Sequence, residues 1–139
     1  MPSSLSALNF LRSWTTVFSH HNAIRTNSLA IRASYNPAMH FPGMRFGEFR
    51  DSLNFDDPPK GVSPLLVALW WDGKGNWTKA HEIAQKIESP DAAWVHAYLH
   101  RKQGDQGNAG YWYGRAGKPH SMAALDAEWE EMARAFLEQ

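Results

Sequence analysis

Residues 63–80, SPLLVALWWDGKGNWTKA, contain the signals that decide the fold. The pair Ser63-Pro64 is typical of a helix start, because a serine side chain can cap the first turn and proline tolerates the first helical position. The apolar run that follows predicts a short, largely buried helix, which a glycine-rich turn ends. Asn76 can then cap a second helix that begins at Trp77. This stretch therefore predicts a helical hairpin.

The same order of signals recurs 29 residues further along the chain. The pair Ser89-Pro90 starts another helix, and Gly104-Asp105 ends that helix and caps the next. Residues with the same physical role match between the two units, which is the pattern of an internal repeat. The matching units lie at 65–87 and 94–116. The repeat predicts that the hairpin is used twice.

The segments on either side of the two hairpins also predict helices. After a cap at Ser121, apolar residues recur at steps of three and four, which is the spacing of one helical stripe. The stripe consists of Met122, Leu125, Trp129, Met132 and Phe136. A short helix is expected around Phe46 and Phe49. No sustained alternation of apolar and polar residues predicts a strand, so the fold class is all-α.

Two stretches carry a resemblance to a known architecture. GNWTKA at 75–80 and GDQGNAGYWYGRA at 104–116 resemble tetratricopeptide-type units, in which a Gly-Asp or Gly-Asn turn precedes a helix with small and aromatic residues. The block 80–119 also resembles an uncharacterised family of short helical proteins. The first resemblance covers residues 45–119 and implies two stacked antiparallel hairpins; with the last helix, apolar on one side and acidic on the other, as a C-terminal cap, the expected domain is residues 45–139. Because stacked repeats bury one face and present another, it also implies a protein-interaction module with a protein partner.

The N-terminal residues 1–44 differ in composition from the rest of the chain. Up to residue 47 there are four arginines and no lysine, aspartate or glutamate, whereas residues 48–139 have a net charge of −4. A basic, serine-rich and acid-free segment is typical of a poorly ordered tail or a targeting segment. We expect a cytoplasmic protein, or a mitochondrial one if the segment is a transit peptide. No stretch is long and apolar enough to predict a membrane span.

Three histidines form a candidate metal site. His96 and His100 are four residues apart on one predicted helix and therefore share a face. His81 lies on the preceding helix, level with Tyr98 if the hairpin is tight. Three imidazoles with an open position would suit zinc or another divalent metal. The alternative is that the histidines satisfy one another in a packed interface, with no cofactor implied.

A surface groove on the second hairpin is the other candidate site. Its expected lining is histidine, tyrosine and arginine side chains: His96, His100, Tyr98, Tyr111, Tyr113 and Arg101. Trp112 is expected to pack in the core. The basic residues of this hairpin are too sparse to predict nucleic-acid binding in an acidic domain.

Composition and motifs exclude several kinds of active site. The chain has no cysteine, which excludes disulfides, thiolate metal sites and thiol nucleophiles. It contains no glycine-rich phosphate loop and no Gly-x-Ser-x-Gly. The stretch HEIAQ at 81–85 lacks the second histidine of a metalloprotease helix. We therefore expect a protein-interaction module rather than an enzyme, with a divalent-metal-binding protein or a metal-dependent enzyme built on the three histidines as the alternative.

Overall fold

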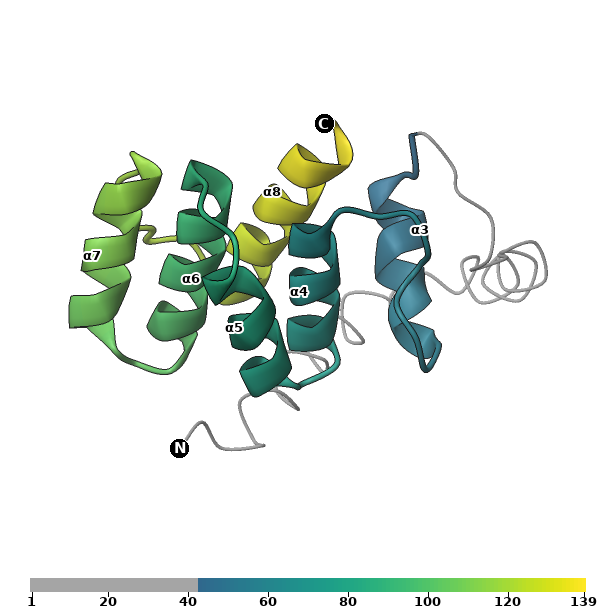
Figure 1. Ribbon diagram of the computed structural model, residues 1–139, viewed down its shortest axis with the longest axis horizontal. Helices are drawn as coiled ribbons and strands as arrows, with labels where there is room; N and C mark the ends of the chain where they lie inside the picture. The colour runs from purple at the N-terminus through teal and green to yellow at the C-terminus, as the bar shows by residue number, and fades with distance from the viewer. Residues whose placement is uncertain (1–42) are drawn as a thin grey trace.

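The computed structural model describes residues 43–139 (Figure 1). Within this range the chain forms α-helices and one short 3₁₀-helix and no strand, so the all-α prediction is confirmed. The elements are α3 (Phe46–Asp51), η1 (Ser52–Asn54), α4 (Pro64–Gly73), α5 (Trp77–Gln85), α6 (Pro90–Lys102), α7 (Gln106–Ala116) and α8 (Leu125–Leu137). No helix in this range is long and apolar enough to cross a membrane. The predictions for the N-terminal tail concern residues that lie outside the described range, apart from Gly43 and Met44. Of these two, Met44 is buried.

The predicted helix caps of both hairpins are present. Ser63 Oγ and Ser89 Oγ accept hydrogen bonds from the backbone N–H groups three residues further on, at 3.4 and 3.0 Å. Asn76 Oδ1 and Asp105 Oδ1 do the same, at 3.1 and 3.2 Å. Each cap satisfies one of the N–H groups that a helix start leaves without an internal partner. The four helices of the hairpins therefore begin where the sequence predicts.

The predicted start of the last helix is wrong. α8 begins at Leu125 after Ala124, which provides no side-chain cap, and Ser121 Oγ accepts instead from the N–H of Ala123 in the preceding loop. Met122, expected in the apolar stripe, is 93% exposed. The rest of the stripe faces the core: Trp129, Met132 and Phe136 are buried.

The helices pack around α6. α4 packs against α5 and α6 against α7, while α5 and α4 also contact α6. α8 lies against α4 and α6. α3 lies against α8, on the side of the molecule opposite α7 (Figure 1). As a result every residue of α6 from Ala92 to Leu99 is buried. This central helix carries two of the three candidate metal ligands.

Two buried carboxylates fix the C-terminal half of α6. Asp72 of α4 accepts from Lys102 Nζ at 3.0 Å and from Tyr98 Oη at 3.1 Å. Burial raises the pKa of Asp72, and the charge of Lys102 opposes that rise. Glu128 of α8 is equally buried and pairs with Arg101 of α6. The side chains of both basic residues are mostly buried as well, so these contacts are interior ion pairs.

Two glycines at the end of α7 give opposite predictions for stability. Gly114 lies on an exposed part of the helix, and a Cβ there would meet no atom within 4 Å. Gly114→Ala should raise the free energy of unfolding by about 0.5–1 kcal/mol, because glycine inside a helix is unfavourable by that amount. Gly117, the C-cap, has a φ of 69°, a left-handed conformation that is unfavourable for alanine. Gly117→Ala should therefore lower the free energy of unfolding by about 1 kcal/mol. Urea unfolding followed by circular dichroism measures both changes, and the same sign in both variants would contradict this reading of α7.

Candidate metal centre

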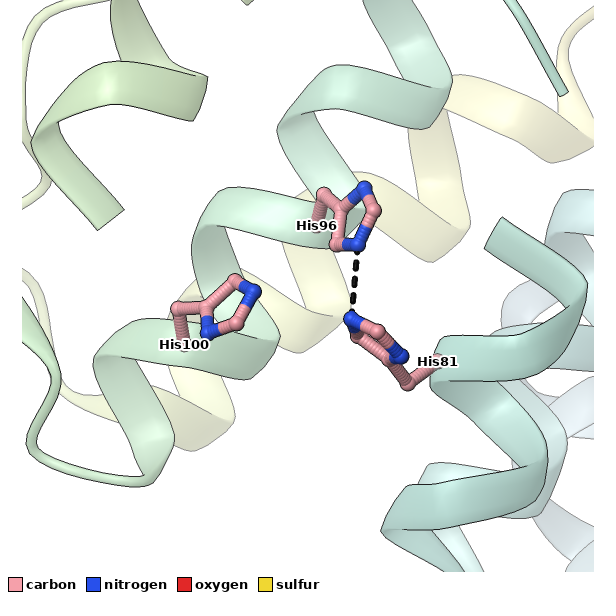
Figure 2. Close-up of side chains that lie close together, drawn as sticks. All are labelled: His81, His96 and His100. Atoms are coloured by element: carbon pink, nitrogen blue, oxygen red, sulfur yellow. Dashed lines mark hydrogen bonds between the residues drawn. The ribbon is translucent and has the colours of Figure 1, made fainter. Parts of the chain in front are cut away.

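The structure brings the three predicted histidines together. His96 and His100 are one turn apart on α6, and His81 reaches them from α5 (Figure 2). The Nε2 atoms of His81 and His96 are 2.8 Å apart, which is a hydrogen bond in which one ring donates and the other accepts. One ring nitrogen from each histidine lies within 4.8 Å of the others. The capped starts of α5 and α6 set the register that makes this convergence possible.

Two tryptophans form walls beside the cluster. Trp77 stacks on His81, with ring centroids 4.7 Å apart and planes at 11°, and its Nε1 donates to Leu99 O of α6. Trp112 of α7 stacks on His96 at 4.2 Å and 18°. Sequence reasoning did not assign either ring to the site. The spacing of four between Trp77 and His81 was a usable signal, because residues four apart on a helix are neighbours.

The electrostatics of the cluster favour neutral imidazoles. Burial first, and then the neighbouring His81 and His100, lower the pKa of His96 to about 4. The pKa of His81 is lowered by burial and then by His100, and that of His100 is lowered by burial against the opposing charge of Asp105. A neutral imidazole keeps the lone pair that a metal ion needs. At neutral pH the three rings are therefore in the protonation state that binds metal.

One nitrogen of the cluster has no hydrogen bond. Within residues 43–139, His100 Nδ1 is buried and makes none. The closest acidic atom to it is Asp105 Oδ2, at 3.8 Å, which is beyond hydrogen-bond distance. Buried polar atoms in folded proteins are nearly always paired, so this atom needs an explanation.

The geometry is close to that of a metal site. In tetrahedral zinc sites with Zn–N bonds of about 2.0–2.1 Å, two ligand nitrogens are about 3.3 Å apart. The Nε2 atoms of His81 and His96, 2.8 Å apart, are slightly closer than this. Distances among the ring nitrogens of all three histidines reach 4.8 Å. The nitrogens that are 4.8 Å apart would have to approach by about 1.5 Å to reach this spacing. Three imidazoles leave a fourth position for water or another ligand, which is the donor set of open zinc sites.

The residues predicted for a surface groove do not share a surface. Tyr98 and Tyr113 are buried, and their hydroxyls donate to Asp72 and Glu128, at 3.1 and 2.5 Å. The prediction that both tyrosines line a groove is therefore wrong, because each ring is held inside by a carboxylate from a distant helix. Arg101 is drawn inward by Glu128 in the same way.

Of the six groove residues, the two histidines belong to the metal candidate and Tyr111 alone is strongly exposed, at 56%. Trp112, which was expected to pack in the core, is only half-buried and stacks on His96. Of the predicted groove, only the two histidines and the exposed Tyr111 are left. Tyr111 contacts Trp112, which forms one wall of the histidine cluster.

The comparisons with known proteins give no family to which the site can be assigned. No protein-family model, no curated protein and no solved structure matches this chain.

Proposed function

We propose that this protein binds a divalent transition-metal ion, with zinc as the first candidate, through His81, His96 and His100. The observation that carries the proposal is the placement of three ring nitrogens within 4.8 Å of one another. Their lowered pKa values keep all three rings neutral at physiological pH, which favours metal over proton. An all-nitrogen donor set suits zinc, copper, nickel and cobalt better than magnesium or calcium.

The alternative interpretation, in which the histidines only satisfy one another, explains two of the three rings. The hydrogen bond between His81 and His96 accounts for that pair. His100 takes no part in that hydrogen bond, although its ring centroid is 5.3 Å from that of His81 and 5.4 Å from that of His96. A metal ion would use the third ring and would separate the first two by the small distance that the ligand geometry requires.

A second candidate function is protein binding by a tetratricopeptide-like stack. The pairing of α4 with α5 and of α6 with α7, with α8 against both pairs, supports the proposal of two stacked hairpins and a capping helix. The specific observation in favour of a partner is the exposed ring of Tyr111, since tyrosine is enriched at protein interfaces. This function is compatible with a metal centre, because Tyr111 lies beside the Trp112 wall rather than within the histidine cluster.

Metal binding is tested by titrating the full chain, freed of metal by a chelator, with Zn²⁺ and Co²⁺ in a calorimeter. We expect one ion per chain and, for Co²⁺, the visible absorption of a tetrahedral complex. The double variant His96→Ala, His100→Ala should lose more than about 100-fold in affinity, since even residues that only orient metal ligands contribute about 10–100-fold.

His120→Ala is the matched control for that titration. His120 is exposed and its Nε2 is 2.8 Å from Gln106 Oε1, outside the cluster. Its variant should bind metal as the wild type does. Absence of binding in the wild type, or equal binding in the double variant, would contradict the proposed function.

A further inference from the structure

We propose that Asp105 is a positioning residue of the metal centre: its carboxylate takes the Nδ1–H of His100 and thereby leaves the Nε2 atom of His100 to bind the ion. This inference rests on the proposed function and names the part of the site that lies outside the three ligands. Asp105 acts through His100 and does not itself contact the metal.

The positions of the two side chains support this assignment. His100 Nδ1 is buried, has no hydrogen bond within the described residues, and lies 3.8 Å from Asp105 Oδ2. Figure 2 shows the other side of the His100 ring turned toward His81 and His96. One nitrogen thus faces a carboxylate, and the second faces the space where the other two ligands meet. In this arrangement Nδ1–H can donate a hydrogen bond to the carboxylate while Nε2 is left to bind a metal ion.

The chemistry of a neutral imidazole makes this separation necessary. The neutral ring has one N–H and one lone pair, and the proton can sit on either nitrogen. A carboxylate beside Nδ1 holds the proton there, so that the lone pair is on Nε2. In metal sites such a partner also orients the ring and makes the ligand more basic. The gap of 3.8 Å must shorten by about 0.8 Å to reach a normal hydrogen bond. The Asp105 side chain is 44% exposed, so part of it is not packed against other residues.

Asp105 has a second task, which does not require its charge. Its Oδ1 accepts from the backbone N–H of Asn108 as the N-cap of α7, and its Oδ2 accepts from Asn108 Nδ2 at 2.6 Å. At the matching position of the first hairpin, Asn76 caps α5 through the same backbone contact with an amide side chain. An amide is therefore sufficient for the cap. The negative charge at position 105 is an additional property, and it is placed beside a metal-ligand candidate where the first hairpin has none.

The decisive variant is Asp105→Asn, because asparagine caps a helix about as well as aspartate. Zn²⁺ affinity, measured by competition with a chromophoric chelator, should fall about 10–100-fold. The melting temperature of the metal-free protein should stay within about 2 °C of the wild type, as expected for a retained cap. Asp56→Asn, which neutralises an exposed carboxylate between η1 and α4, should leave the affinity unchanged.

A measurement on the metal-free wild type tests the same assignment without any ion. Long-range ¹⁵N–¹H correlation spectra distinguish the two tautomers of a neutral histidine. We expect His100 of the wild type to have its proton on Nδ1, and Asp105→Asn to shift the ring toward a mixture. A helix cap alone would not change this signature. Should Asp105→Asn reduce stability, Asp105→Ser retains a capping oxygen without charge and should show the same loss of affinity.

The outcomes separate this inference from the proposed function. A wild type that binds no metal contradicts the proposed function and this inference together. A wild type that binds metal while Asp105→Asn and Asp105→Ser bind it equally well contradicts the role of Asp105 alone. A His100 proton on Nε2 in the metal-free wild type would also overturn it.

Discussion

Replacing Glu128 by alanine is expected to lower the free energy of unfolding by about 3–5 kcal/mol, because breaking a buried ion pair leaves its partner charged and uncompensated. The Glu128 carboxylate is buried and accepts three hydrogen bonds, from Arg101 at 2.6 Å, Tyr113 at 2.5 Å and Trp94 at 3.1 Å. Two of these donors lie on α6 and one on α7. Without the carboxylate, all three donors lose this buried acceptor.

Glu130→Ala is the matched control on the same helix. Glu130 pairs with Arg134 at 2.7 Å across one helical turn, but their side chains are 34% and 57% exposed. Removing such a surface pair should cost less than about 0.5 kcal/mol. Chemical unfolding in urea at neutral pH measures both variants. Losses of similar size would show that the interior contacts of Glu128 do not have the importance that its burial indicates.

Acid is expected to destabilise the metal-free protein through the histidine cluster, beginning near pH 6.5. The pKa of His96 is about 4 in the folded state and that of an unfolded histidine is about 6.5. Between these values the unfolded chain binds the proton and the folded chain does not, so stability rises with pH across this window and falls as the pH is lowered. A difference of this size corresponds to at most about 3–4 kcal/mol for His96. His81 and His100, whose pKa values are also lowered, act in the same direction.

The pH effect is measured as a difference between two proteins. Free energies of unfolding of the wild type and His96→Gln, taken in chelator from pH 4 to pH 7, should converge or cross as the pH falls, because glutamine has no proton to gain. The comparison also removes the contribution of Asp72, whose raised pKa acts in the opposite direction at the acid end and is common to both proteins. A difference that does not change with pH would contradict a buried, neutral His96.

The sequence predicted those features that depend on local spacing. The caps at Ser63, Asn76, Ser89 and Asp105 define where four helices begin, and each needs a partner only three residues away. The convergence of the histidines follows from two such local facts, namely a spacing of four on one helix and a short connection to the preceding one. Local signals were therefore sufficient to locate the candidate metal centre.

Features that depend on distant partners could not be predicted in this way. The burial of Tyr98 depends on Asp72, 26 residues earlier, and that of Tyr113 depends on Glu128, 15 residues later. No periodicity indicates which of many carboxylates enters the interior. The start of α8 was missed for a similar reason: Arg101 of α6 donates to the carbonyl of Ala123, so a tertiary contact holds the backbone that the stripe at Met122 would have made helical.

The enclosure of α6 has a consequence for the entropy of the proposed metal binding. A helix covered along Ala92–Leu99 and held by ion pairs at Arg101 and Lys102 has little freedom to lose when a ligand arrives. The backbone that carries His96 and His100 is therefore held in place before an ion arrives, whereas the rings must still turn to bring nitrogens that are up to 4.8 Å apart to ligand distance. In the proposed metal centre, selectivity among metal ions would then depend on how far the three rings can turn, rather than on folding of the site around the ion.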